Sequence, residues 1–263
     1  MEEKDQKYLL KLADKNLADS IKHRVENIEG GKLYETDNYI IYTIGIDNED
    51  GHLNGALCLN DKYAEEMFSK AEEFFSPLKR NYSVWVRAHE DYNLERILKE
   101  KGLEPKRQPG SAGMIMTNRI ETVDLPSGFE IKTVKTDEEI KDFISVTKDA
   151  FDKSDEVGQR MFSTKATLCA PNVKSFLIYE GHKPMSAAIT VISGDVSGIY
   201  YVGTIESGRG LGLGSYIVQE STNAGFDAGS PVVILQASAA GERVYTKLGY
   251  EKITYYRSYI RDF

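Results

Sequence analysis

Residues Tyr200 to Ser215 read Y-Y-V-G-T-I-E-S-G-R-G-L-G-L-G-S and run directly into an apolar-periodic segment, Tyr216 to Phe226. This pattern predicts a strand that leads through a glycine-rich loop into a helix. Glycines remove the side chains that keep a ligand off the backbone, and a helix start adds unpaired N–H groups and a positive dipole end. The stretch therefore predicts a phosphate or pyrophosphate site, to which Arg209 adds a full charge.

The spacing of the glycines narrows the class of ligand. A dinucleotide fingerprint needs G-x-G-x-x-G, and no start at Gly208, Gly210 or Gly212 puts a glycine at the sixth position. A Walker loop needs lysine after its last glycine, whereas Gly208 is followed by Arg209. Neither nucleotide motif is present.

The spacing that does fit is R-x-x-G-x-G, formed by Arg209, Gly212 and Gly214. A second motif follows at Leu235 to Tyr250, L-Q-A-S-A-A-G-E-R-V-Y-T-K-L-G-Y, and looks like a strand, a short helix and an L-Y-x-K-L-G-F ending. Together the two motifs resemble the GNAT superfamily of acyl-CoA-dependent N-acyltransferases. The resemblance covers Gly128 to Phe263, about half of the chain.

The resemblance implies acetyl-CoA as cosubstrate, with its pyrophosphate on the glycine loop and helix start. It also implies that backbone groups of Val202, Gly203 and Thr204 contact the oxyanion and the pantetheine amides, because the family splays its strand there. The second helix of the family often starts with Asn, and here Ser238 takes that place in the predicted cofactor site. The loop residues predicted to bind the cofactor are Arg209, Gly210, Leu211, Gly212, Leu213, Gly214 and Ser215.

In the implied reaction an amine attacks the thioester directly and expels the CoA thiolate. Tyr245 stands at the position of the family's tyrosine general acid, and a phenol with a pKa of ~10 stays protonated at neutral pH and can donate to a thiolate. A packed aromatic residue is the alternative interpretation of Tyr245. The sequence does not identify the base, for which a water chain or an acidic side chain could serve. The acidic candidates are Glu206, Asp195, Asp152 and Asp155.

Composition sets the broad class of the protein. Its 263 residues predict two domains, and a net charge of −8 with interleaved lysines argues against nucleic-acid binding and would attract a cationic amine. No apolar run is long enough for a membrane span or resembles a signal peptide, so we predict a cytoplasmic protein without a membrane partner. Two isolated cysteines and four scattered histidines predict no metal site.

An internal repeat supports two related halves. Glu95 to Glu104 aligns with Glu242 to Glu251, and a predicted strand precedes each segment at nearly equal distance. In this alignment Leu98 stands where Tyr245 stands, and the first half has no counterpart of the glycine loop. We therefore expect one cofactor site per chain.

The polar stretch Thr117 to Gly128 separates the halves. We predict a degenerate GNAT-like domain at 1–120 and a catalytic GNAT domain at 126–263. The predicted fold class is α+β, with each domain a mixed, mostly antiparallel sheet flanked by helices.

Several local elements are also expected. Tyr8 to Ile28 predicts one or two amphipathic helices, and Asn38 to Ile46 with His52 to Leu59 predicts a hairpin that turns at Asp50-Gly51. Val232 to Leu235 predicts a strand buried on both faces.

The function that these patterns predict is an N-acetyltransferase, which moves an acetyl group from acetyl-CoA to an amine of a small molecule or peptide. The alternative is a noncatalytic acyl-CoA-binding sensor or assembly module, because the loop explains cofactor binding without proving turnover. The acceptor is left open among amino acids, polyamines, aminoglycosides and protein N-termini, and a homodimer is left open as well.

Overall fold

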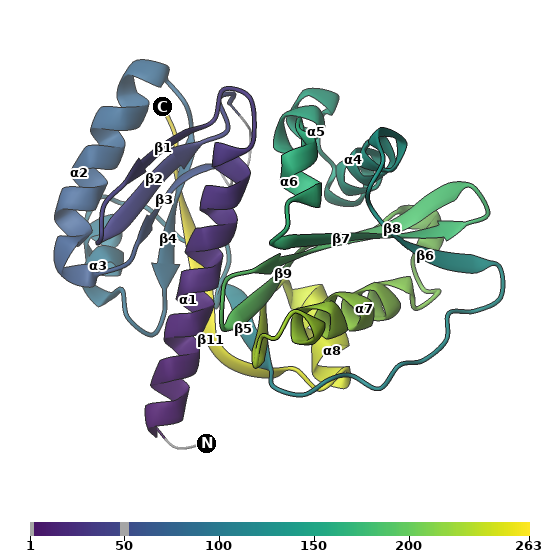
Figure 1. Ribbon diagram of the computed structural model, residues 1–263. Helices are drawn as coiled ribbons and strands as arrows, with labels where there is room; N and C mark the ends of the chain where they lie inside the picture. The colour runs from purple at the N-terminus through teal and green to yellow at the C-terminus, as the bar shows by residue number, and fades with distance from the viewer. Residues whose placement is uncertain (1–2, 48–52) are drawn as a thin grey trace.

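The computed structural model describes residues 3–47 and 53–263, in which eleven strands form one sheet with helices on both faces (Figure 1). The strand order is β1-β2-β3-β4-β11-β5-β10-β9-β8-β7-β6. Only two of the pairings between described strands, β3–β4 and β9–β10, are parallel. The predicted fold class is confirmed, and the two sheets are continuous with each other.

The first half supplies, in chain order, α1 (Glu3–Glu26), β1 (Lys32–Glu35), β2 (Tyr39–Thr43), β3 (Asn54–Cys58), the 3-10 turn η1 (Asp61–Tyr63), α2 (Ala64–Phe75), the 3-10 turn η2 (Ser76–Leu78), β4 (Tyr82–Arg87), α3 (Tyr92–Glu100) and β5 (Ser111–Met116). The second half supplies β6 (Phe129–Thr133), α4 (Asp137–Phe151), α5 (Asp155–Met161), α6 (Lys165–Cys169), β7 (Val173–Glu180), β8 (Lys183–Ile192), β9 (Val196–Thr204), the 3-10 turn η3 (Glu206–Gly208), α7 (Leu213–Asp227), β10 (Val232–Ala237), α8 (Ala239–Lys247) and β11 (Glu251–Arg261).

The internal repeat extends to the order and length of the elements. Each half ends with a helix, a strand, a short helix and a last strand. Strands β4 and β10 both have six residues, and helices α3 and α8 both have nine. Leu98 and Tyr245 occupy the same place in their helices, as the alignment of the two segments predicts.

The last strand of each half lies in the sheet of the other half. Strand β11 pairs with β4 of the first half, strand β5 pairs with β10 of the second, and β5 and β11 pair with each other between them. The sequence did not indicate this exchange. The domain boundaries at 1–120 and 126–263 stay a prediction. Because of the exchange, the range 1–120 lacks β11, which flanks β4, and the range 126–263 lacks β5, which flanks β10.

Helix α1 is a single helix and packs across the junction of the halves (Figure 1). Its Leu9 and Leu12 contact a cluster that includes Val232 and Ile234 of β10, whereas Leu17 and Ile21 belong to a cluster on the first half. The opposite face of β10 packs into a third cluster through Val233 and Leu235, which confirms that this strand is buried on both faces.

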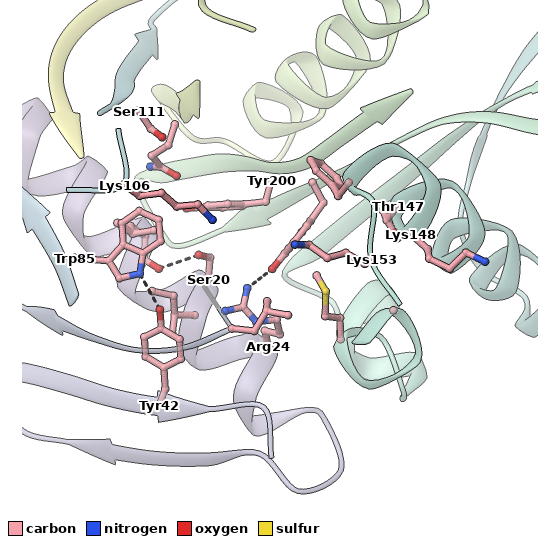
Figure 2. A pocket seen from close by; sticks show the side chains of 18 of the residues that line it. Ser20, Arg24, Tyr42, Trp85, Lys106, Ser111, Thr147, Lys148, Lys153 and Tyr200 are labelled. Atoms are coloured by element: carbon pink, nitrogen blue, oxygen red, sulfur yellow. Dashed lines mark hydrogen bonds between the residues drawn. The ribbon is translucent and has the colours of Figure 1, made fainter. Parts of the chain in front are cut away.

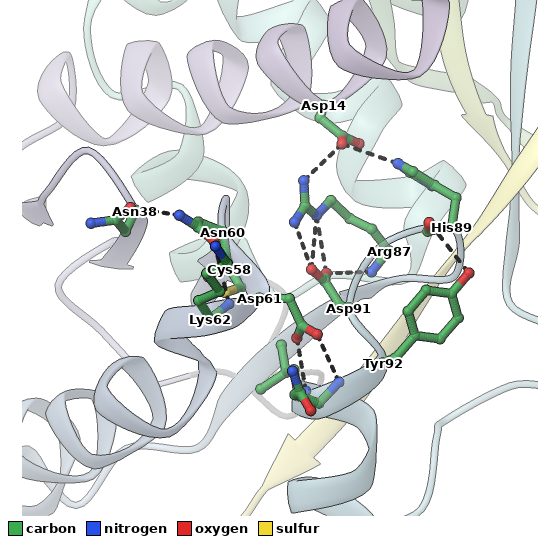
Figure 3. A network of polar contacts seen from close by, with 12 residues as sticks. Asp14, Asn38, Cys58, Asn60, Asp61, Lys62, Arg87, His89, Asp91 and Tyr92 are labelled. Atoms are coloured by element: carbon green, nitrogen blue, oxygen red, sulfur yellow. Dashed lines mark hydrogen bonds and ion pairs between the residues drawn. The ribbon is translucent and has the colours of Figure 1, made fainter. Parts of the chain in front are cut away.

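A buried network of charges ties α1 to β4 (Figure 3), and a hydrogen bond from Tyr256 connects β11 to it. Arg87 of β4 lies 2.6 Å from Asp91 and 2.8 Å from Asp14 of α1, and these side chains are at most 10% exposed. Asp14 also accepts a hydrogen bond from the Tyr256 hydroxyl of β11 and lies 3.1 Å from His89 Nε2. The exchanged strand is therefore held by polar contacts as well as by its backbone ladder.

Local predictions in both halves are confirmed. Strands β2 and β3 form the predicted antiparallel hairpin, while its turn at Asp50-Gly51 lies outside the described residues. Thr136 caps α4, and Glu139 completes the capping box. Strands β7, β8 and β9 form an antiparallel meander, the third strand of which leads into the glycine loop.

Candidate active site

The glycine loop joins η3 to α7 and leaves a set of backbone amides open. Gly210 and Gly212 both have φ of 80°, a left-handed conformation that favours glycine, and Gly212 is the N-cap of α7. No described residue accepts a hydrogen bond from the backbone N–H groups of residues 210–214. Arg209 is exposed beside them. The predicted loop thus has the open amides and the positive end that an anion needs.

Strand β9 parts from β10 just before this loop. Their parallel pairing ends at Ile199 and Leu235, so Tyr200 to Thr204 have no partner on that edge of β9. On the other edge, the β8–β9 register shifts between Ala187 and Ile189. Val202, Gly203 and Thr204 therefore lie along the free edge, where the resemblance places cofactor contacts.

The register shift is a β-bulge that changes which way two side chains face. Tyr201 has a φ of 53°, a conformation rare for residues other than glycine. A regular strand would send Tyr200 and Tyr201 to opposite faces, but both line one cavity on the α1 side. Val202 then packs against the cluster that contains Leu213 and Ile217 of α7. The bulge therefore shifts the alternation of side chains between the two faces of β9 at the point where β9 and β10 part.

The structure gives Gly203 a packing reason to be glycine. A Cβ atom at this position would lie 2.7 Å from Ala150 Cβ and 3.2 Å from the Phe151 ring of α4. Ser186 on β8 donates a hydrogen bond to the Gly203 carbonyl at 2.9 Å. A side chain at Gly203 would therefore displace α4, whether or not the backbone contacts a ligand.

Helix α8 presents the two remaining predicted residues. Ser238 is the N-cap of α8, and its side-chain oxygen accepts a hydrogen bond from the Gly241 backbone N–H at 3.2 Å. The hydroxyl group of Ser238 can still donate its own proton to a ligand. The Tyr245 ring packs against the apolar cluster that contains Val202, Leu213 and Leu235. No described residue hydrogen-bonds to the Tyr245 hydroxyl, and burial raises its pKa to about 12.

A cavity of about 420 Å³ lies on the α1 side of the same strands (Figure 2). Its walls come from both halves: Arg24 from α1, Trp85 from β4, Phe151 from α4, and Tyr200 and Tyr201 from β9. Gln236 at the end of β10 and Ser111 of β5 line it as well. Because Tyr200 and Tyr201 belong to the unpaired segment of β9, the cavity adjoins the place where the two strands part.

The acidic side chains considered as bases do not line this cavity. Asp155 is exposed and lies 2.9 Å from Lys148, and Asp152 is the left-handed C-cap of α4. Glu206 and Asp195 are exposed on η3 and on the turn before β9. None of these four acidic residues is among the described residues that line the cavity.

Neither cysteine has the features of a nucleophile. Burial raises the pKa of Cys58 to about 12, and it also raises the pKa of Cys169, so both thiols stay protonated at neutral pH. Within residues 3–47 and 53–263, no group of three or more His, Cys, Asp or Glu side chains could hold a metal ion. The same residues include no helix with the length and apolar character of a membrane span.

Arg24 is one of several cavity-lining residues that the sequence analysis did not identify. It donates a hydrogen bond to the Tyr201 hydroxyl, and its guanidinium carbon lies 5.9 Å from the Tyr201 ring centroid. A signal was present, because Arg24 follows Leu17 by two helical turns and lies within the apolar stripe that includes Ile21 and Val25.

Comparisons with known proteins agree with this geometry. A family model described as FR47-like protein matches residues 177–258. A GCN5-related N-acetyltransferase from Kribbella flavida superposes with a TM-score of 0.71 at 17% identity, covering 94% of this chain and 95% of that chain. One from Sphaerobacter thermophilus gives 0.63 at 14% identity, with 88% and 82% covered.

A tandem GNAT protein from the clavulanic acid biosynthesis pathway gives a TM-score of 0.63 at 9% identity, covering 92% of this chain and 87% of that chain. A search of curated proteins finds no match. At such identities a structural likeness establishes the fold alone. The chain therefore has the fold of these N-acetyltransferases along nearly its whole length, and within its second half residues 177–258 also match the FR47-like family model.

Proposed function

We propose that the protein transfers an acetyl group from acetyl-CoA to an amine, with the two reactants meeting where β9 and β10 part. The observation that carries this proposal is the arrangement around the unpaired segment Tyr200 to Thr204. The glycine loop and Tyr245 flank it on the α7 side, and the cavity opens on the α1 side. A cofactor and an acceptor could thus approach the same backbone from opposite faces.

The residues at the start of α7 fit the pyrophosphate of CoA. The open amides of Gly210 to Gly214 can donate to phosphate oxygens, and Arg209 can add a charge-assisted contact. A Cβ atom at Gly214 would meet nothing closer than Thr204 Oγ1 at 3.8 Å, so there is room for a ligand against the helix end.

Each protein group then has one task in the reaction. Bound CoA thioester would supply the activated acetyl group. Backbone N–H groups on the free edge of β9 would stabilise negative charge that develops on the acetyl oxygen. As the amine nitrogen bonds to the acetyl carbon and the C–S bond breaks, the amine would release one proton to a water chain. Tyr245 would donate its hydroxyl proton to the leaving thiolate, since that hydroxyl has no partner among the described residues. The cavity would hold the amine and exclude bulk water.

The general test is a panel of amines with acetyl-CoA, in which thiol release is followed and CoA binding is measured separately. Release with at least one amine is the expected result. CoA binding without release from any amine would instead support the noncatalytic acyl-CoA-binding sensor.

Replacing Gly214 by Val should weaken CoA binding by about tenfold or more, because the new side chain fills the space at the helix end that the pyrophosphate needs. Arg209→Ala should cost ~1.5–3 kcal/mol of binding, the value of a charge-assisted contact. Isothermal titration calorimetry measures both effects. Wild-type affinity in both variants would remove this loop from the cofactor site.

Gly214 is a cleaner position for this test than Gly212. Gly212 has a φ of 80°, so any side chain there strains the fold, whereas Gly214 lies in the first turn of α7 and outside the left-handed region. Gly214→Val should therefore keep a melting temperature close to that of the wild type. Gly212→Ala should melt at a lower temperature.

The pH dependence of kcat should show no descending limb between about pH 6 and 10. Burial raises the pKa of Tyr245 to about 12, so the acid keeps its proton over this range and loses it only as the pH rises through that value. The ascending limb would report deprotonation of the amine or its base. A descending limb near neutral pH that disappears in Tyr245→Phe would contradict this assignment.

A further inference from the structure

The charge of the cavity is opposite to the charge of the chain. Five cationic side chains line it, and no described lining residue is Asp or Glu, although the net charge is −8. The cationic residues are Arg24, Lys106, Arg107, Lys148 and Lys153. The overall excess of acid suggested attraction of a cationic amine, but the cavity itself would repel a ligand that carried only positive charge.

Arg24 has unused donor capacity inside the cavity. Its hydrogen bond to Tyr201 occupies one terminal nitrogen, while its Nε atom is buried and has no hydrogen-bond partner. No described acidic side chain forms an ion pair with Arg24. The Nε2 atom of Gln236, across the cavity on β10, is likewise buried without an acceptor. Arg24 thus brings to the cavity wall a cation that has no acidic partner among the described residues, and an anionic group in the cavity would supply that partner.

The segment after α3 adds positive charge at the cavity. Lys106 lines the cavity and extends toward its interior, as Figure 2 shows. Burial and the neighbouring Arg107 charge both lower the pKa of Lys106. An anion bound between Lys106 and Arg107 would offset the effect of the Arg107 charge on the pKa of Lys106. Lys148 differs, because its ammonium group points away from the cavity and lies 2.9 Å from Asp155 (Figure 2).

The remaining walls are aromatic. Trp85 Nε1 donates to the Tyr42 hydroxyl at 2.8 Å, so the polar atom of the indole is satisfied within the wall. Phe151 and Tyr201 meet edge to face, with ring centroids 6.4 Å apart. A ligand held here would place an apolar or aromatic body against these rings and an anionic group at Arg24.

We propose that the acceptor is an anionic amine, a small amine that also carries a carboxylate or phosphate group bound by Arg24. This proposal rests on the proposed acetyl transfer from the opposite face of β9. The anion would fix the orientation of the amine in the cavity and direct its nitrogen toward the parted strands. Purely cationic amines would lack that anchor and meet the repulsion of Lys106 and Arg107.

The acetylation arm compares amines that differ only in the anionic group. Phenylalanine is compared with phenylalaninamide, and phosphoethanolamine with ethanolamine, so that the two pairs separate carboxylate from phosphate recognition. The anionic member of at least one pair should have a kcat/KM higher by about tenfold or more. Equal or greater kcat/KM for the members that lack the anionic group, in both pairs, would overturn the proposal.

The binding arm does not need turnover. Trp85 is the only tryptophan of the chain and lies in the cavity wall, so its fluorescence reports ligand binding. Phenylacetate or inorganic phosphate should change the emission saturably, and phenylacetate should act at a concentration about tenfold or more below that of phenylacetamide. No saturable response to phosphate, together with no preference for phenylacetate over phenylacetamide, would overturn the anion site.

Variants complete the design. Arg24→Gln should abolish the preference for the anion, and Arg107→Gln, in an exposed segment, should reduce it without risk to the fold. Lys148→Gln removes the same charge from a side chain that points away, and should leave the preference unchanged. If Lys148→Gln and Arg24→Gln act alike, Arg24 does not hold the anion. An anion response without thiol release from any amine would keep the anion site and reject the transfer reaction.

Discussion

Tyr245→Phe is expected to lower kcat by ~10²–10⁴ while leaving CoA affinity nearly unchanged, because a positioned general acid acts on the barrier more than on ground-state binding. The substitution removes only a hydroxyl that has no described partner, and the ring keeps its place against Leu213 and Leu235. Steady-state kinetics with the best acceptor, together with calorimetric titration of CoA, measure both quantities.

Tyr250→Phe is the matched control for this change. Its hydroxyl lies 2.7 Å from Thr222 Oγ1 in the buried cluster, and its ring centroid is 6.1 Å from that of Tyr245. Loss of this hydroxyl should lower stability and leave kcat largely intact. Turnover of Tyr245→Phe at the wild-type rate, or an equal loss of kcat in the two variants, would show that Tyr245 is a packed aromatic residue and not the acid.

Arg87→Ala is expected to reduce the free energy of unfolding by ~3–5 kcal/mol, because it leaves the carboxylates of Asp14 and Asp91 buried without their cation. The side chain of Arg87 is 5% exposed and that of Asp91 is fully buried. Urea denaturation of the full chain measures the change. The loss should appear as a lower midpoint of the urea denaturation curve.

Arg96→Ala provides the comparison. Arg96 also pairs with an acidic residue four positions later, but this pair with Glu100 is about 60% exposed on both sides, and such pairs contribute ~0–1 kcal/mol. The two substitutions thus remove the same side chain from ion pairs of the same spacing. Similar losses of stability in both variants would mean that the buried network does not hold the junction.

The sequence predicts the parts of this protein that are encoded locally. The glycine loop, the capping box at Thr136 and the hairpin of β2 and β3 each depend on residues a few positions apart, and all are found where the patterns place them. The correspondence of Leu98 and Tyr245 also follows from a short alignment. These features are readable because their physical cause lies within one segment.

Features that depend on distant segments were not predictable in the same way. Strands β5 and β11 carry ordinary strand patterns, and nothing in either pattern specifies a partner in the other half. The cavity joins Arg24, Trp85 and Gln236, which are far apart in the chain, so its basic character cannot be seen in the net charge. The bulge at Tyr201 depends on a register with β8 that composition does not fix.

The exchange of last strands also has a consequence for how the protein is made. A ribosome delivers the first half with β4 exposed along the edge that only β11 can cover, and it delivers β5 before its partner β10 exists. Domains commonly fold one after another as they emerge, but here the sheet of the first half cannot be completed before residues 251–261 of β11 have left the ribosome. The nascent chain must keep two unpaired strand edges from aggregating until then, and its folding should be slow for its size because the decisive contacts are among the most distant in the sequence.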